Sequence, residues 1–191
     1  LFSEIFKSTN GVDGRVSIEV DPRFARDTAA TIGQGKQLWQ IIDRPNLLIK
    51  VPATIEGLPA ITDLISSGIS VNVTLIFSVN RYKEVLAAYA AGLEKGLSNG
   101  ASIRNIHSVA SFFISRIDSE VDKQLPIDSE LRGMTAIANA VMAYEACLAF
   151  EKTPRWQSLK DKGGNLQRPL WASTGVKDQA YDPTRYVMLL V

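Results

Sequence analysis

Leu47-Leu48-Ile49-Lys50-Val51-Pro52-Ala53-Thr54 places one lysine inside an otherwise apolar run. Such a run predicts a strand that is buried on both faces, as in a parallel sheet. Side chains alternate across a strand, so Lys50 shares its face with Leu48 and Pro52. If that face is covered, burial disfavours the ammonium ion and leaves an amine that can attack a carbonyl carbon to form a Schiff base. The alternative is a strand-end lysine whose stem is buried and whose amine reaches water.

Outward from this stretch, segments with strand patterns and helix patterns alternate along the chain. Apolar or alternating runs predict strands over residues 15–21, 47–54, 69–77, 107–114, 169–173 and 186–191. Apolar residues spaced three or four apart predict long helices over residues 24–42, 57–67, 79–93 and 131–150, and shorter ones near 118–124 and 156–163. Ser78 is the predicted N-cap of the third long helix.

This repeated strand–helix order predicts an α/β fold with a parallel sheet covered by helices. A doubly wound open sheet usually carries a glycine-rich phosphate turn after an early strand, and the sequence has neither a G-x-G-x-x-G nor a Walker pattern. A (β/α)8 TIM barrel instead gathers polar residues at the carboxyl ends of many strands, as this chain does. We therefore expect one partial (β/α)8 barrel domain over residues 1–191, with six of the eight strands present and the first two missing.

Composition excludes several classes of function. The 21 Lys and Arg and the 20 Asp and Glu are scattered, so the sequence offers no basic surface for nucleic acid or an anionic membrane. One cysteine, Cys147, and one histidine, His107, exclude an internal disulfide and Cys-rich or multi-histidine metal sites, and we expect both residues to be structural. No apolar run is long enough to span a membrane.

The start of the chain, Leu1-Phe2-Ser3-Glu4, has no initiator methionine and lacks the layout of a signal peptide. The sequence is therefore expected to be a piece of a longer protein. Its expected location is the cytoplasm, or a plastid if the source is photosynthetic.

Six polar side chains fall on one face of the predicted strands by parity: Ser17, Glu19, Lys50, Asn72, Thr74 and Ser111. An amine, a carboxylate, an amide and hydroxyl groups that converge in a barrel mouth suit imine chemistry, which needs a nucleophile, a proton shuttle and donors to the carbinolamine oxygen. The alternative is structural. Asn72 and Thr74 then cap a strand end, and Glu19 pairs with Lys50 as a buried ion pair.

Two basic residues follow strand ends close to serines. Arg116 comes five residues after Ser111, and Lys177 comes four residues after Ser173. The loops after the late strands of a barrel often bind phosphate, and arginine with serine hydroxyls suits a phosphate monoester. The alternative is that each is a solvated basic residue in a loop.

Five motifs, in order along the chain, carry a resemblance to a known family. They are SIEVD at 17–21, LIKVPAT at 48–54, GISVNVTLIFS at 68–78, SVASFFISR at 108–116 and LWASTGVK at 170–177. Together they resemble the transaldolases, the class I Schiff-base enzymes of the non-oxidative pentose phosphate pathway. The resemblance spans nearly the whole chain, and several motifs in the right order are far more specific than any one of them.

The resemblance implies that Lys50 forms a Schiff base with a ketose phosphate, either fructose 6-phosphate or sedoheptulose 7-phosphate. A dihydroxyacetone unit then passes to an aldose phosphate, such as erythrose 4-phosphate or glyceraldehyde 3-phosphate. Glu19 and Thr74 are implied to position a water for proton transfer, and Asn72 to hold donor hydroxyls. Because the imine is the electron sink, the resemblance implies no metal and no organic cofactor.

The resemblance also implies a set of substrate-binding residues: Ser111, Phe113, Arg116, Ser173 and Lys177. Ser111 and Arg116 match phosphate ligands of the family. Lys177 lies where the family has a second phosphate arginine, and it supplies a point charge in place of a bidentate fork.

Two alternatives remain open from the sequence. The related small fructose-6-phosphate aldolase favours a tyrosine where this chain has Phe113, and it lacks the long helix predicted over 131–150. A catalytically inactive fragment would at most bind a sugar phosphate, because the family's acid/base aspartate and a substrate-binding asparagine lie on strands that precede this chain. The sequence does not predict the oligomeric state.

Overall fold

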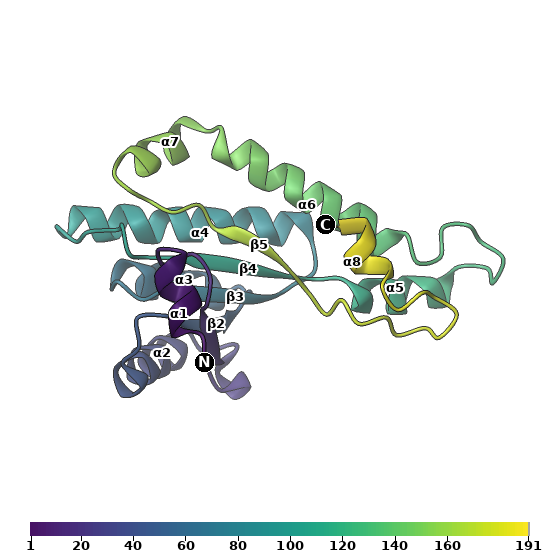
Figure 1. Ribbon diagram of the computed structural model, residues 1–191, viewed down its shortest axis with the longest axis horizontal. Coiled ribbons are helices and arrows are strands. Elements are labelled where there is room, and N and C mark those ends of the chain that lie inside the picture. Colours follow the sequence, from purple (N-terminus) through teal and green to yellow (C-terminus); the bar gives the residue numbers. More distant parts are fainter. Residues whose placement is uncertain (191) are drawn as a thin grey trace.

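The fold is a five-stranded parallel sheet with a layer of helices on one face. The structure is a computed structural model, and it describes residues 1–190. Each strand pairs in parallel with the next one along the chain, in the order β1 (Val16–Glu19), β2 (Leu47–Pro52), β3 (Val71–Ile76), β4 (Ser108–Phe113) and β5 (Arg168–Ala172) (Figure 1). Because the strand order never reverses, the sheet is wound in one direction, as in a (β/α) barrel and unlike a doubly wound sheet.

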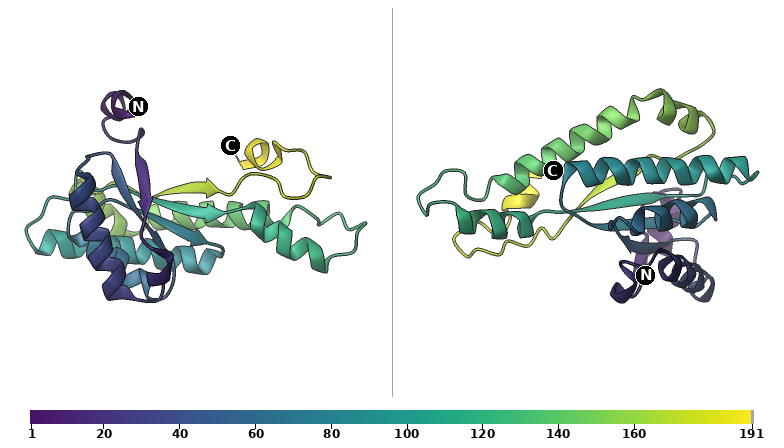
Figure 2. Two further views of the ribbon diagram at one scale, coloured as in Figure 1. Left: turned by 90° about the horizontal axis from the view of Figure 1, so that it is seen from below. Right: turned by 180° about the vertical axis from the view of Figure 1, so that it is seen from behind.

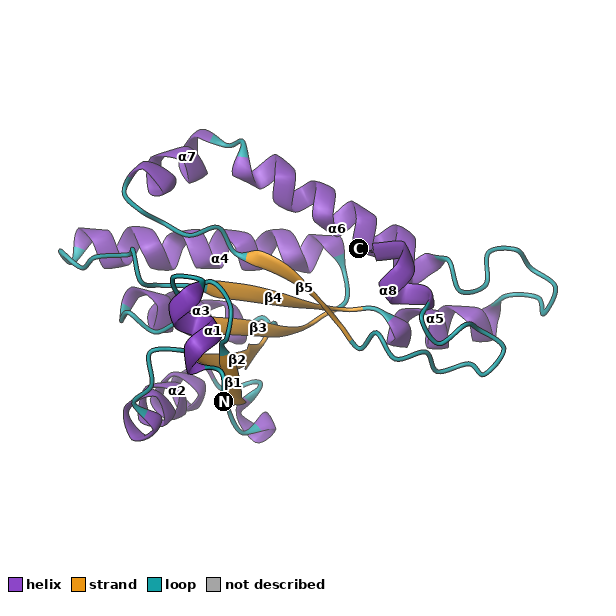
Figure 3. Cartoon of the chain, in the orientation of Figure 1, coloured by secondary structure: helices purple, strands orange, loops and turns teal. Residues whose placement is uncertain are grey.

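The helices alternate with the strands, as the sequence predicts (Figure 3). The longer ones are α2 (Thr28–Ile42), α3 (Gly57–Ser66), α4 (Val79–Ser98), α6 (Thr135–Glu151) and α7 (Pro154–Asp161). The short elements are α1 (Ser3–Ser8), η1 (Pro22–Phe24), α5 (Ser115–Val121), η2 (Asp122–Gln124) and α8 (Arg185–Leu190). The predicted N-cap is confirmed, because Oγ of Ser78 accepts a hydrogen bond from the Arg81 amide at 3.2 Å.

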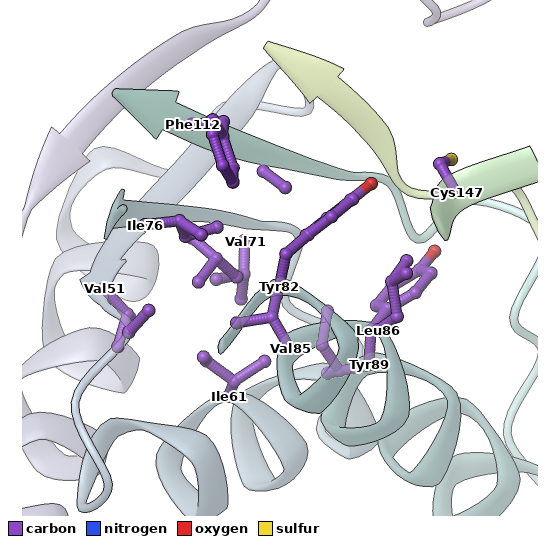
Figure 4. Close-up of a cluster of buried hydrophobic side chains, with 14 of the residues drawn as sticks. Val51, Ile61, Val71, Ile76, Tyr82, Val85, Leu86, Tyr89, Phe112 and Cys147 are labelled. Atoms are coloured by element: carbon purple, nitrogen blue, oxygen red, sulfur yellow. The ribbon is translucent and has the colours of Figure 1, made fainter. Parts of the chain in front are cut away.

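The hydrophobic core lies between the sheet and this helix layer (Figure 4). Val51, Val71 and Ile76 from the strands are fully buried, and they pack with Tyr82 of α4 and Phe112 of β4. The rings of Tyr82 and Phe112 meet edge to face, with centroids 6.2 Å apart. Burying each such side chain stabilises the fold by about 1.5–3 kcal/mol, so this layer fixes the strands and the polar residues they carry.

The sheet is open, with β1 and β5 as its two edges. Figure 2 shows α1 on the side of the sheet away from α2 and α4. There a guanidinium nitrogen of Arg168, in β5, donates to the carbonyl of Val12 at 3.0 Å, so the two ends of the sheet are joined across its concave face. The α/β class and the parallel sheet are confirmed, and the architecture is that of a partial barrel.

The sixth predicted strand, over 186–191, is wrong. Residues 185–190 form helix α8, and Val191 lies outside the described residues. Within α8, Tyr186 is 1% exposed and Leu190 packs on the core, whereas Met188 between them is 73% exposed. This four-residue spacing is helical, and a short, wholly apolar run does not separate a strand from a helix by its pattern. Residues 1–190 therefore supply five strands of the sheet.

Two kinds of feature are absent from residues 1–190. None of their helices has both the length and the apolar character needed to cross a bilayer. No three of their His, Cys, Asp or Glu side chains gather into a group that could hold a metal ion.

Candidate active site

Lys50 forms an ion pair with Glu19 on the concave face of the sheet. The register of β1 against β2 sets these residues side by side, and Nζ of Lys50 lies 3.2 Å from Oε2 of Glu19. Their side chains keep 28% and 42% of their surface exposed. The pair is formed, as the structural alternative has it, but it is not fully buried. The Lys50 side chain lies closer to the alternative of a buried stem and an amine that reaches water, because this face of the open sheet reaches solvent at β2.

Asn72 links three strands on the same face. It lies beside Lys50 in the register of β2 against β3. Its Nδ2 donates to Oγ of Ser17 at 3.0 Å, and its Oδ1 accepts from Oγ of Ser111 at 2.7 Å. β1 and β3 are not neighbours, so the bond between Ser17 and Asn72 requires a sheet that curves toward this face. Contacts therefore join five of the six polar side chains predicted to share this face, and Thr74 is the exception.

Thr74 carries a buried hydroxyl that has no hydrogen-bond partner among residues 1–190. Buried hydroxyl groups are nearly always bonded, so such an exception calls for an explanation. The backbone beside it is also unusual. Leu75 adopts a left-handed conformation with φ of 58°, and the register of β3 against β4 shifts between Val73 and Ile76. Strained backbone of this kind is found preferentially at functional sites.

Arg116 stacks on an aromatic ring just beyond the end of β4. Its guanidinium carbon lies 4.9 Å from the ring centroid of Phe113. Phe113 is 8% exposed, and the centroids of the Phe113 and Phe77 rings are 5.2 Å apart. No ion pair joins Arg116 to a carboxylate within the described part of the chain. The stacking holds a cation near the carboxyl ends of the strands without neutralising it.

Ser173 and Lys177 follow β5 and lie beside α5. Oγ of Ser173 is 3.0 Å from Oγ of Ser115, and the Ser115 amide donates to the Ser173 carbonyl at 3.0 Å. Exposed Lys177 and Arg116 line the same cavity of about 580 Å³. The structure thus brings the two predicted phosphate cations to one cavity.

Sequence reasoning missed two buried carboxylates that line a second cavity, of about 700 Å³, to which Lys177 also contributes. Asp118 and Asp122 are 1% and 6% exposed, and each accepts two hydrogen bonds from groups on other elements. The signal in the sequence is their spacing, because residues four apart lie on one face of a helix.

The two residues expected to be structural lie in apolar or basic surroundings. Burial raises the pKa of the Cys147 thiol, and its Sγ lies 3.8 Å from the carbonyl of Gln167. Partial burial, helped by Arg15 and Arg168, lowers the pKa of His107 to about 4. His107 precedes β4, so it lies at the amino end of the strands, opposite to the loops that carry Arg116 and Lys177.

The chain is similar to several bacterial proteins named transaldolase. It is 56% identical to the transaldolase of Thermobifida fusca (strain YX), over 98% of this chain and 52% of that protein. It is 55% identical to the transaldolase of Saccharopolyspora erythraea, over 100% of this chain and 52% of that protein. A transaldolase of Mycobacterium bovis is 57% identical over 97% of this chain and 52% of its own length. The chain spans about half the length of the curated relatives it matches.

A family model described as transaldolase/fructose-6-phosphate aldolase matches residues 1–191. The match therefore includes all five strands and the polar residues on their concave face. On this match and on the similarity to the named relatives, the chain belongs to the transaldolase/fructose-6-phosphate aldolase family.

Proposed function

We propose that this chain carries the Schiff-base centre of a transaldolase. The observation that supports this most strongly is Lys50, a lysine on a central strand that lies against Glu19 and beside the bonded amide of Asn72. A nucleophile, a carboxylate and an oriented amide on one concave face are the groups that imine formation at a ketose carbonyl requires. The relatives with more than half of their aligned residues identical are named transaldolase.

In the proposed reaction, the Lys50 amine attacks the C2 carbonyl of fructose 6-phosphate or sedoheptulose 7-phosphate, and the carbinolamine loses water to give a protonated imine. Removal of the C4 hydroxyl proton breaks the C3–C4 bond, whose electron pair moves into the imine to give an enamine. The aldose phosphate leaves. The enamine then adds to the aldehyde carbon of an acceptor such as erythrose 4-phosphate, and hydrolysis frees the lysine.

Residues near Lys50 are assigned to proton transfer and to binding the hydroxyl groups of the substrate. Glu19 and Thr74 position a water for proton transfer, and the unpaired hydroxyl of Thr74 is free to bond that water. Asn72 holds donor hydroxyls. Its amide is already oriented by Ser17 and Ser111, so little ordering is left for the substrate to impose.

The phosphate group of the sugar is assigned to the cavity lined by Arg116 and Lys177. Glu120 also lines this cavity, and its carboxylate is paired with Lys123. Phe113 supports Arg116 by stacking, and Ser173 contacts Ser115 at the start of α5. Ser111 remains a predicted phosphate ligand. Its hydroxyl proton is committed to Asn72, so donation to a phosphate requires that bond to be given up.

The test is reduction with borohydride in the presence of fructose 6-phosphate, followed by intact mass and peptide mapping. We expect an adduct on the peptide that contains Lys50, and at least a hundredfold less of it in Lys50→Met. Lys83→Met, a change to an exposed lysine of α4, is the matched control and should react as the parent does. A folded parent chain that gives no adduct, or gives it on another lysine, contradicts the proposal.

The two alternative functions are less well supported. The small aldolase lacks a helix at the position of α6, which is present here over Thr135–Glu151, and Phe113 has no hydroxyl. An inactive sugar-phosphate-binding fragment would form no covalent adduct, whereas the more similar relatives are named transaldolase. Product analysis separates the three, since transfer requires an acceptor, cleavage releases free dihydroxyacetone, and a binding fragment gives neither.

We infer a cytoplasmic location, with a plastid as the alternative, for an enzyme whose partners are sugar phosphates. The support is the bacterial origin of the relatives and a single, unpaired cysteine, Cys147.

A further inference from the structure

The segment that carries Lys177 depends on other elements for its position. Residues 173–184, between β5 and α8, form neither helix nor strand. In Figure 1 the segment leaves β5, runs beside α5 and turns back toward α6. A lysine on such a segment gains a fixed position only from bonds to the elements around it.

Two buried aspartates bind this end of the chain through tyrosines. The hydroxyl of Tyr181 donates to Oδ2 of Asp122 at 2.7 Å. The hydroxyl of Tyr186, at the start of α8, donates to Oδ2 of Asp118 at 2.7 Å. Both aspartates are nearly buried, and bonds to a buried carboxylate are among the strongest neutral–ion hydrogen bonds in proteins.

The same aspartates also bind the start of α6. The amide of Gly133 donates to Oδ1 of Asp122 at 3.0 Å, and the amide of Ala136 donates to Oδ1 of Asp118 at 2.8 Å. Each carboxylate therefore ties together three parts of the chain. Both join the α5–η2 region to the start of α6, and the third part is residues 173–184 for Asp122 and α8 for Asp118. If one tyrosine loses its hydroxyl, the aspartate that it bound still joins the α5–η2 region to the start of α6.

The ring of Tyr181 is fixed by packing as well. Gly133 has φ of +69°, and a Cβ atom there would lie 2.9 Å from Cζ of Tyr181, so the ring rests directly on the glycine. The guanidinium of Arg185 lies 5.0 Å from the centroid of this ring. Tyr181 is four residues from Lys177, and its position limits where that lysine can lie.

We propose that Asp118 and Asp122 are positioning residues for the phosphate site. Through Tyr181 they hold residues 173–184, and through Tyr186 they hold α8, where that segment ends, so that Lys177 and Arg116 share one cavity before a ligand arrives. The inference rests on the proposed role of these two cations in phosphate binding. Ordering the segment in advance lowers the entropy lost when an anion binds.

The test removes one hydroxyl at a time and keeps each ring. Tyr181→Phe and Tyr186→Phe are each expected to raise the dissociation constant of inorganic phosphate about 3- to 10-fold, the effect of leaving one or two side chains to be ordered on binding. NMR titration of the chain with inorganic phosphate measures the constant. Tyr144→Phe, at a half-exposed tyrosine of α6, is the matched control and should leave it unchanged.

A double-mutant cycle separates positioning from general stability. Lys177→Met should itself weaken phosphate binding, and Tyr181→Phe should add no further loss in that background, because the tyrosine acts through the lysine. Phosphate affinity within twofold of the parent in both tyrosine variants overturns the inference. So does a loss that persists in full in the Lys177→Met background. Tyr181 is only half-buried, so its variant should fold, and circular dichroism checks this.

Failure of the positioning inference can be distinguished from failure of the proposed Schiff-base reaction. Dihydroxyacetone has no phosphate, so borohydride trapping of dihydroxyacetone on Lys50 should be equal in the parent and in the two tyrosine variants. Absence of trapping in the parent counts against the Schiff-base proposal alone. A phosphate affinity that Lys177→Met leaves unaltered overturns the positioning inference and says nothing against Lys50.

Discussion

Thr74 and Thr31 are both buried, and their hydroxyl groups differ in one respect. Oγ1 of Thr31 donates to the carbonyl of Phe24 at 2.9 Å, whereas Oγ1 of Thr74 has no partner within residues 1–190. Valine keeps the shape of threonine and removes the hydroxyl. We expect Thr74→Val to raise the free energy of unfolding by about 1 kcal/mol, and Thr31→Val to lower it by about 1 kcal/mol. Urea unfolding followed by circular dichroism measures both.

The stability gained in Thr74→Val should be accompanied by a loss of reactivity. If the hydroxyl, unpaired among the described residues of the free chain, bonds the proton-carrying water only when substrate is bound, trapping of fructose 6-phosphate on Lys50 should slow by about 10- to 100-fold in this variant and stay unchanged in Thr31→Val. A Thr74→Val chain that is less stable than the parent and reacts as fast would mean that the hydroxyl is bonded in solution and takes no part in the chemistry.

At the scale of elements, α3 and α4 approach each other at Gly92. A Cβ atom on Gly92 would lie 2.6 Å from Cβ of Ile65 and 3.0 Å from the carbonyl of Thr62. We expect Gly92→Ala to push the helices apart and to lower the free energy of unfolding by about 1–3 kcal/mol. Gly33 of α2 is the matched control, because a Cβ there meets nothing within 4 Å.

Gly33→Ala should instead raise the free energy of unfolding, because alanine favours a helix by about 1 kcal/mol over glycine and causes no clash here. Thermal unfolding of the parent, Gly92→Ala and Gly33→Ala tests both predictions. Equal stabilisation in both variants would show that α3 and α4 can separate at Gly92 without loss, and that the close approach there is not needed for the fold.

The elements were predictable where sequence pattern and burial agree. Around β2 and β3 the apolar runs are long, bounded by turns and interrupted by single polar residues, so the pattern admits only a strand. The run 186–191 is short and wholly apolar, so its pattern fits a strand or a helix. The helix is favoured by the burial of Tyr186 and its bond to Asp118, 68 residues earlier in the chain. Such a contact is absent from any local pattern.

For the whole molecule, parity along the strands was enough to bring Glu19, Lys50 and Asn72 to one face. Parity did not predict how much of these side chains is exposed to solvent. That fraction depends on whether the sheet closes into a barrel, and here β1 and β5 remain edge strands. The bonds of Tyr181 to Asp122 and of Arg168 to Val12 were also beyond the sequence, since each joins segments brought together by the fold alone.

The burial of His107, near two arginines, makes the stability of the fold depend on pH. At the amino ends of the strands, Arg15 and Arg168 repel each other and lie near His107, and burial together with Arg168 lowers the pKa of Arg15 to about 10. Asp13 pairs with Arg168 at 3.0 Å. Protonating His107 would add a third positive charge, which explains the direction in which the two arginines shift its pKa.

The folded-state pKa of His107, about 4, is below its ordinary value of 6.5. Between these values the unfolded chain binds more protons, so stability is complete above pH 6.5 and falls as the pH falls toward 4. Allowing for partial exposure, the loss attributable to His107 is about 1–2 kcal/mol. His107→Gln should flatten the dependence of the free energy of unfolding between pH 6.5 and 5. That window is clear of Asp63 and Glu94, whose lowered pKa values act below about pH 4.5.

Urea unfolding at half-unit steps of pH measures this slope in the parent and in His107→Gln. His107 is the single histidine of the chain, so its ring signal in an NMR titration also reports its pKa directly. A ring that titrates near 6.5, or a variant with the slope of the parent, would mean that His107 is solvated in solution and carries none of this pH dependence. The test therefore probes whether the amino end of β4, where His107 lies beside Arg15 and Arg168, is as dry in solution as the fold places it.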